Sequence, residues 1–190
     1  MRVGILALQG AVEPHAEKLR RLGAEPVAVL KASDLVDIQG VILPGGESTT
    51  MLRLLRLNDL FDPLKDFVNR RPAWGLCAGA ILLAKRVTSP EQPSLGAMQI
   101  AVERNAFGRQ IHSFIARLNS PRPELDGLEG VFIRAPRIRD VQGGEILMSW
   151  QGEPVMVEEG DRLAATFHPE LTESDRLHEY FLKRCEAAHG

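Results

Sequence analysis

Short apolar runs and amphipathic segments alternate through the first 84 residues of the chain. The run Val3–Leu8 is continuously apolar, as expected of a strand that is buried on both faces. Val12–Leu22 has a helical pattern and stops at Gly23, a typical C-terminal helix cap. The other predicted strands are Glu25–Leu30, Gly40–Leu43 and Ala73–Leu76, and the other predicted helices are Thr49–Leu57, Leu60–Asn69 and Ala78–Ala84. This alternation predicts an α/β fold with an open, mainly parallel sheet and helices on both faces.

The second half of the chain has a different pattern, in which short β-like runs are separated by turn signals such as Asp126-Gly127 and Gly143-Gly144. The predicted runs are Ile111–Leu118, Gly130–Ile133, Ile146–Trp150, Pro154–Val157 and Leu163–Phe167, and Thr88–Gly96 and Asn119–Gly127 are expected to be loops. Glu173–Ala188 closes the chain as an amphipathic helix. We expect an antiparallel extension of a three-layer, flavodoxin-like sheet, with residues 1–190 forming one domain.

Composition and charge narrow the functional classes. The chain has 190 residues, 44% of them hydrophobic and 25% charged, and a formal net charge of −2. The cations are scattered, so we expect no nucleic-acid partner, because phosphate neutralisation requires clustered cations. Val3–Leu8 is too short for a signal-peptide core and no run reaches membrane-spanning length, so we expect no membrane partner. Two cysteines cannot form a disulfide framework, and a reducing cytoplasm is the expected location.

The segment Gly75-Leu76-Cys77-Ala78-Gly79 is a candidate nucleophile elbow at a strand-to-helix junction. The G-x-C-x-G pattern fits a sharp turn, at which side chains on the two glycines would crowd neighbouring elements. Such a turn lifts the Cys77 sulfur to the carboxyl edge of the sheet and to a helix N-terminus, where a thiolate is favoured. The alternative is a small structural cysteine in a tight turn.

A base and a carboxylate for this thiol are found in Phe167-His168-Pro169-Glu170, which follows a predicted strand. A thiol nucleophile needs an imidazole to take its proton, and the imidazole needs a carboxylate to fix its tautomer. His168 and Glu170 can fill these roles if the loop is held, and Pro169 restricts the backbone between them. The alternative is a solvated turn. The other histidines are assigned differently: His15 to the first helix, His178 and His189 to the surface, and His112 as an alternative base, while Cys185 is interpreted as structural.

The segment Pro44-Gly45-Gly46-Glu47 lies between a predicted strand and a helix and can approach a substrate closely. We expect the N–H of Gly46 to form one half of an oxyanion hole and the N–H of Ala78 to form the other. The structural alternative for part of this segment is that Ser48 or Thr49 caps the following helix. The segment lacks the G-K-[ST] of a phosphate loop. No Cys/His cluster has metal-ligand spacing, so neither a metal nor another cofactor is expected.

Six segments together resemble class I (triad) glutamine amidotransferases, and specifically the family of glutaminase subunits of pyridoxal 5′-phosphate synthase (the PdxT/SNO family). They are Leu6–Ala11, Pro44–Thr50, Cys77–Gly79, Val102–Gln110, Phe132–Pro136 and Phe167–Thr172. The resemblance spans nearly the whole chain. Two positions depart from it: Leu76, where a small polar residue is expected, and His112, where an acid is common.

The resemblance implies a role for each candidate residue. Cys77 would be the nucleophile, and His168 and Glu170 would be its relay. Contacts to the substrate L-glutamine are implied for Gly45, Gly46, Glu47, Arg104, Ile133 and Arg134. The implied partner is a barrel-shaped synthase subunit that accepts the ammonia for vitamin B6 synthesis. Two rivals stay open: a peptidase or γ-glutamyl hydrolase on the same fold, and a non-catalytic flavodoxin-like binding module.

Overall fold

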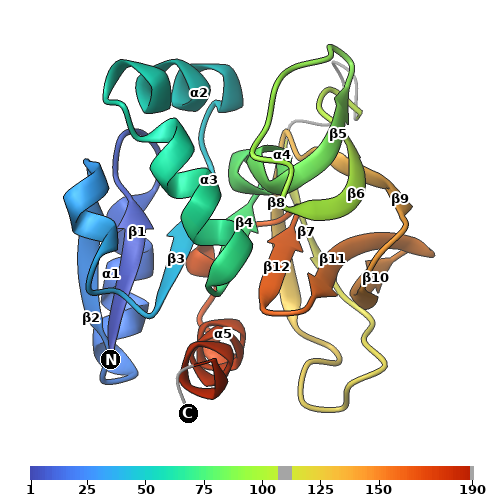
Figure 1. Ribbon diagram of the computed structural model, residues 1–190. Coiled ribbons are helices and arrows are strands. Elements are labelled where there is room, and N and C mark those ends of the chain that lie inside the picture. The colour runs from blue at the N-terminus through green and yellow to red at the C-terminus, as the bar shows by residue number, and fades with distance from the viewer. Residues whose placement is uncertain (107–112, 189–190) are drawn as a thin grey trace.

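A seven-stranded sheet forms the centre of the computed structural model, which describes residues 1–106 and 113–188. Its strand order is β10-β11-β12-β4-β3-β1-β2 (Figure 1). The parallel strands are β1 (Arg2–Leu6), β2 (Glu25–Val29), β3 (Gly40–Leu43), β4 (Ala73–Leu76) and β12 (Arg162–Ala165), and the antiparallel strands are β10 (Glu145–Trp150) and β11 (Glu153–Glu159). The predicted α/β class, with a mainly parallel sheet and an antiparallel extension, is confirmed.

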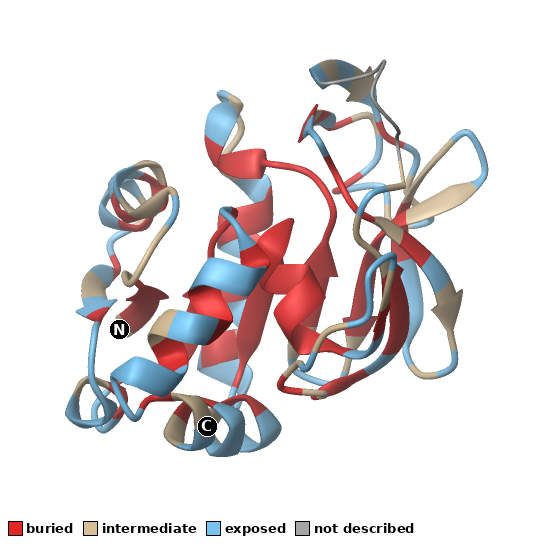
Figure 2. Cartoon of the chain, turned by 90° about the horizontal axis from the view of Figure 1, so that it is seen from above, coloured by how far each residue is buried: buried red, intermediate tan, exposed pale blue. Residues whose placement is uncertain are grey.

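Helices cover both faces of this sheet, and each face has its own hydrophobic core. The helices are α1 (Val12–Arg21), α2 (Ser48–Leu57), α3 (Phe61–Arg70), α4 (Ala78–Leu83) and α5 (Arg176–Ala187), with short 3₁₀ turns η1 (Ala32–Leu35) and η2 (Pro169–Leu171). Helices α2, α3 and α4 contribute to the core that holds Val41 and Leu43, whereas α1 and α5 contribute to the core that holds Ile42. The alternation along β3 follows from the two-residue period of a strand. Figure 2 shows the buried strands between helices whose outer sides are exposed.

Two smaller sheets lie beside the main one. β5 (Ala84–Thr88), β6 (Met98–Glu103) and β9 (Arg137–Val141) form one of them, and β7 (Ser113–Arg117) pairs with β8 (Glu129–Ile133) in the other. β5, β6 and β9 were not predicted. In β5 the strand interior is Lys85-Arg86, which is exposed, so its sequence lacks the apolar run of a buried strand. The helix predicted over Ala78–Ala84 ends at Leu83, and β5 begins at the next residue, Ala84.

The C-terminal helix starts later than the sequence pattern predicts, at Arg176 instead of Glu173. The buried Lys18 of α1 explains the difference, because its ammonium donates hydrogen bonds to the backbone carbonyls of Thr172 (2.8 Å) and Ser174 (2.9 Å). Those carbonyls therefore accept hydrogen bonds from α1 in place of the backbone N–H groups of a longer α5. Within residues 1–106 and 113–188, no helix has both the length and the apolar character needed to cross a bilayer.

Candidate active site

Cys77 occupies a strained turn between β4 and α4. Its backbone has φ 50° and ψ −102°, a conformation that residues with a side chain rarely adopt. Its N–H donates a hydrogen bond to the carbonyl of Ala165 on β12 (2.8 Å), which ties the turn to the neighbouring strand. A Cβ on Gly75 would collide with the carbonyl oxygen of Gly79, and one on Gly79 with the carbonyl oxygen of Leu43. The two glycines are therefore required by the turn, as the motif predicts.

His168 and Glu170 lie next to this turn, immediately after β12. The His168 Nδ1 and the Glu170 Oε1 are 2.7 Å apart, and the Glu170 side chain is fully buried. The Cys77 thiol also interacts with the His168 side chain and contributes to the raised pKa of that ring. The His168 N–H donates to the carbonyl of Val131 on β8 (2.8 Å), and Pro169 begins the 3₁₀ turn η2 that carries Glu170. A thiol, an imidazole and a carboxylate are thus connected in series.

The protonation of this series follows from opposing effects. Burial disfavours the imidazolium, but the interactions with Cys77 and Glu170 outweigh it and raise the pKa of His168 to about 10. Burial likewise disfavours the carboxylate of Glu170, but the hydrogen bond from His168 and the nearby His15 outweigh it and lower the pKa of Glu170. At neutral pH the arrangement therefore favours an imidazolium that is held by a carboxylate.

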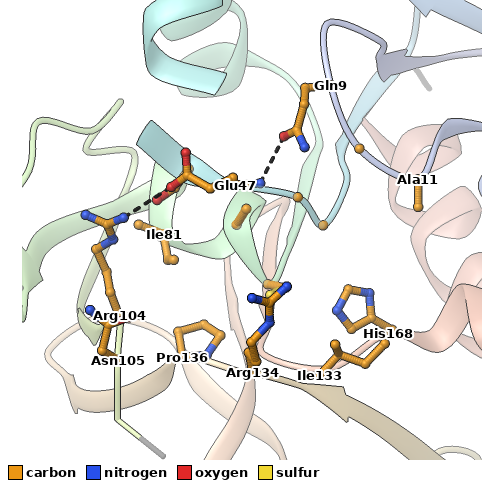
Figure 3. A pocket seen from close by; sticks show the side chains of 16 residues that line it. Gln9, Ala11, Glu47, Ile81, Arg104, Asn105, Ile133, Arg134, Pro136 and His168 are labelled. Carbon is orange, nitrogen blue, oxygen red and sulfur yellow. Dashed lines mark hydrogen bonds and ion pairs between the residues drawn. The ribbon is translucent and has the colours of Figure 1, made fainter. Parts of the chain in front are cut away.

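The Gly45-Gly46 loop follows β3 and packs against the same histidine. A Cβ on Gly45 would collide with the Cε1 of the His168 ring, so the loop approaches the imidazole as closely as a backbone can. A segment after β1 holds the loop in place. The Ala11 N–H donates to the Gly45 carbonyl at 3.4 Å, and the Gln9 Oε1 accepts a hydrogen bond from the Glu47 N–H at 2.9 Å (Figure 3).

Glu47 caps helix α2, so the alternative in which Ser48 or Thr49 caps it is wrong. The Glu47 carboxylate accepts hydrogen bonds from the backbone N–H groups of Thr49 (3.0 Å) and Thr50 (2.7 Å). Burial opposes its ionisation, but the bonds from Thr50 and Thr49 outweigh this effect and lower the pKa of Glu47. These are the second and third N–H groups of the helix, which an N-cap side chain normally satisfies. A negative charge also interacts favourably with a helix N-terminus.

A cavity of about 490 Å³ joins these elements. It is lined by every predicted site residue except Glu170, which lies behind His168: Gly45, Gly46, Glu47, Cys77, Ala78, Arg104, Ile133, Arg134 and His168. Arg134, at the end of β8, has a φ of 42° and points into the cavity (Figure 3). Arg104 donates a hydrogen bond to Thr49 Oγ1 (3.0 Å) and lies 3.3 Å from the Glu47 carboxylate. The volume suits a small ligand.

The model of the SNO glutamine amidotransferase family matches residues 5–187 of the chain. The chain belongs to this family. The chain is 51% identical over 190 residues to a pyridoxal 5′-phosphate synthase subunit PdxT from Solibacter usitatus, covering 96% of this chain and 98% of that one. The PdxT of Thermotoga maritima is 46% identical over 185 residues, with the same coverage.

Solved structures agree with this family assignment. A crystal structure described as a glutamine amidotransferase superimposes with a TM-score of 0.90 at 46% identity, covering 97% of this chain and 98% of the other. The structure of PurLQS from Thermotoga maritima superimposes with a TM-score of 0.74 at 14% identity, covering 96% of this chain and 97% of the other. The second match shows that the two chains share a fold.

Other predicted residues of this family member lie away from the cavity or outside the described residues. His178 was expected at the surface, but it is fully buried and its Nε2 lies 2.9 Å from the Nδ1 of His15. The error arose because α5 lies on the sheet face that α1 also covers, a contact between segments 163 residues apart. Cys185 is fully buried, and burial raises the pKa of its thiol to about 12. His112, His189 and Arg109 lie outside the described residues.

Seven residues that line the cavity were not among the predicted site residues. They are Gln9, Gly10, Ala11, Ser48, Ile81, Asn105 and Pro136. Asn105 and Pro136 fall within two of the segments that carry the family resemblance, so the resemblance was the only signal that could have found them. Ile81 lies one turn into α4, and its N–H donates to the carbonyl of Cys77 (3.2 Å). The helical spacing from the nucleophile could have found this position.

Proposed function

We propose that the chain is a glutaminase subunit that hydrolyses L-glutamine to L-glutamate and ammonia for pyridoxal 5′-phosphate synthesis, with Cys77 as its nucleophile. The observation that carries this proposal is the connected series of Cys77, His168 and Glu170 beside the Gly45-Gly46 loop. Family membership supports the reaction class, since the matching family is one of glutamine amidotransferases. The relatives named as synthase subunits support the biosynthetic role.

In the proposed mechanism, the Cys77 thiolate attacks the side-chain amide carbon of glutamine. The N–H groups of Ala78 and Gly46 stabilise the resulting oxyanion. The imidazolium of His168 gives its proton to the departing nitrogen, so that ammonia leaves and a γ-glutamyl thioester remains on Cys77. His168, now neutral, takes a proton from a water molecule, which attacks the thioester. Glutamate leaves, and the thiolate and imidazolium are restored.

Recognition of the α-amino and α-carboxylate groups of glutamine is assigned to the rim of the cavity. The Glu47 side chain is 52% exposed although it caps α2, so an oxygen can also accept a bond from the ammonium. Arg134 points into the cavity and suits the carboxylate (Figure 3). Arg104, which is paired with Glu47, orients that acid, while Gly45, Gly46 and Ile133 contact the apolar stem.

The ammonia is proposed to pass to a barrel-shaped synthase subunit. Free ammonia is protonated in water and loses its nucleophilicity, so a docked acceptor with a shielded path preserves it. We also propose that residues 1–190 form one domain, because β10 and β11 extend the same sheet that carries Cys77. A reducing cytoplasm suits the two cysteines, neither of which forms a disulfide.

Incubation with glutamine, with and without the synthase subunit of the same organism, tests the proposed function. Ammonia and glutamate formed in equal amounts, with a higher rate in the complex, is the expected result. Cleavage of γ-glutamyl peptides without a partner would instead identify the peptidase or γ-glutamyl hydrolase. An absence of turnover on either substrate, with and without partner, would leave a non-catalytic binding module.

A further inference from the structure

A buried polar contact lies behind the proposed triad, on the side away from Cys77. Glu170 uses Oε1 for His168, and its second oxygen, Oε2, lies 3.6 Å from the Nε2 of His15. Both side chains are fully buried. Neither His15 Nε2 nor Glu170 Oε2 has a hydrogen bond from any residue in 1–106 or 113–188. A buried ring nitrogen and a buried carboxylate oxygen without other partners therefore face one another, at a separation that a shift of a few tenths of an ångström would close to a hydrogen bond.

The tautomer of His15 follows from its other neighbour. Burial is the main reason that the pKa values of His15 and His178 are lowered to about 3, so both rings are neutral at pH 7. The His15 Nδ1 lies 2.9 Å from the His178 Nε2, so one of these two atoms must carry the proton. A proton on the His15 Nδ1 would leave a bare Nε2 lone pair facing the Glu170 carboxylate. A proton on the His15 Nε2 instead makes it a donor to Glu170, with His178 donating to Nδ1.

Helix α1 links this contact to the rest of the cavity. Ala11, at the start of α1, holds the Gly45 carbonyl, and Lys18 holds the carbonyls of Thr172 and Ser174 just beyond η2. His15 lies between Ala11 and Lys18 on the same helix and faces the carboxylate of η2. One helix therefore contacts the glycine loop, the acid and the chain that follows the acid.

We propose that His15 is a positioning residue for the reaction, which donates a hydrogen bond from Nε2 to Glu170 Oε2 and is kept in that tautomer by His178. This inference rests on the proposed function, because it assumes that Glu170 orients His168. The donated bond fixes the carboxylate plane and stabilises the ionised acid. The acid in turn keeps His168 protonated and aimed at the leaving ammonia.

Two amide substitutions of His15 test its two ring nitrogens individually. The amide of glutamine reaches the position of Nε2, whereas the amide of asparagine reaches only that of Nδ1. In the complex with the synthase subunit, His15→Asn is expected to lower the glutaminase kcat about 10- to 100-fold, the loss that is typical when a group orienting a metal-ligating residue is removed. KM should change little, because His15 is absent from the cavity wall. His15→Gln should restore most of the loss.

The pH profile distinguishes positioning from simple packing. The charged and titratable groups that face His15 are Glu170 and His168 from the segment after β12, His178 from α5 and Lys18 on α1. A weaker interaction between Glu170 and His168 lowers the pKa of His168. The basic limb of kcat/KM should therefore move to lower pH in His15→Asn and stay in place in His15→Gln. Equal kinetics and equal basic limbs in the two variants would overturn the inference.

Two controls keep the result interpretable. If Glu170→Gln is impaired while His15→Asn matches the wild type, the inference about His15 fails and the proposed triad stands. If Glu170→Gln also matches the wild type, the triad itself fails. The tautomer of His15 is measured without any variant by ¹⁵N NMR of the wild-type chain at pH 7, with the signals assigned by His15→Gln. A protonated Nε2 is expected, and a protonated Nδ1 would overturn the inference even if His15→Asn does not fold.

Discussion

At the scale of single residues, the two cysteines of this chain have opposite surroundings. Cys77 sits at the end of β4 in a strained turn, beside an imidazole whose pKa is raised to about 10. Cys185 is buried on α5, where its pKa is raised to about 12 and its thiol stays protonated. Since the thiolate is the reactive form of cysteine, only Cys77 has the surroundings of a nucleophile.

Replacing each cysteine by alanine should therefore give different results. Cys77→Ala is expected to abolish ammonia release from glutamine while leaving the fold and the docking of the synthase subunit intact, because the thiol faces the cavity. Cys185→Ala, the matched control, should retain turnover and lose roughly 1 kcal/mol of stability through a small cavity. Ammonia assays and thermal unfolding measure both effects. Turnover near the wild-type rate in Cys77→Ala would move the nucleophile elsewhere.

The role proposed for Glu170 differs from that of Cys77, because Glu170 contacts His168 and does not line the cavity. Glu170→Gln should lower turnover by up to about 10⁴-fold, as loss of the orienting carboxylate does in a comparable triad. The variant should still form a Cys77 adduct with a glutamine-like electrophile, detected by mass spectrometry of the intact chain. Full activity in this variant would remove Glu170 from the mechanism.

At the scale of elements, the elbow between β4 and α4 depends on backbone atoms that cannot move aside. Gly79→Ala should destabilise the chain by more than about 3 kcal/mol, in the range of severe overpacking, because the new Cβ meets the Leu43 carbonyl. Gly152→Ala is the matched control: Gly152 has a φ of 80° but open space around it, so only about 1 kcal/mol of backbone strain is expected. Chemical unfolding measures both. Equal losses would show that the elbow is not close-packed.

The elements also show how far the sequence predicted the structure. β3 and β4 match the predicted ranges because both are buried on two faces, which gives an uninterrupted apolar run. β9 was missed because its sequence, Arg-Ile-Arg-Asp-Val, has only two apolar residues and two adjacent charged ones, so it shows neither an apolar run nor a strict alternation. His178 as a buried residue was missed because its partner His15 lies 163 residues away, whereas Glu47 as a cap was missed because Ser, Thr, Asn and Asp are the usual N-cap residues.

At the scale of the whole molecule, the two buried histidines predict sensitivity to acid. The pKa values of His15 and His178 are about 3 in the folded chain and near 6.5 when unfolded, so between these values the unfolded chain binds more protons. Stability should therefore fall as the pH drops from about 6.5 toward 3, by up to roughly 1.4 kcal/mol per pH unit for each histidine.

Urea unfolding from pH 7 to pH 4 measures this slope. His178→Gln removes one of the two groups, so its stability should fall less steeply with decreasing pH than that of the wild type, whatever its absolute value. The same slope in both chains would mean that His178 does not control the acid response.

The proposed complex with the synthase subunit is the largest scale at which a prediction applies. The hydrogen bond from the Ala11 N–H to the Gly45 carbonyl is long, at 3.4 Å. The orientation of the Gly45–Gly46 peptide is therefore held only weakly in the isolated chain. We expect the isolated chain to be a poor glutaminase, and the partner to raise its rate about 10²- to 10³-fold by fixing this oxyanion donor.

Steady-state ammonia release, without and with saturating synthase subunit, measures the activation. Gln9→Ala should reduce it, because Gln9 holds the loop through the Glu47 N–H, whereas Val36→Ser, an exposed change outside the cavity, should not. Equal rates without and with the partner would contradict this expectation.

The claim central to all three scales is that glutamine is hydrolysed through a thioester on Cys77. The most direct measurement is rapid acid quenching of the complex during turnover of glutamine, followed by mass spectrometry of its peptides. The peptide that contains Cys77 should carry one γ-glutamyl group, and Cys77→Ala should carry none. Steady glutamine hydrolysis in the Cys77→Ala complex, or the γ-glutamyl group on another residue, would contradict the claim.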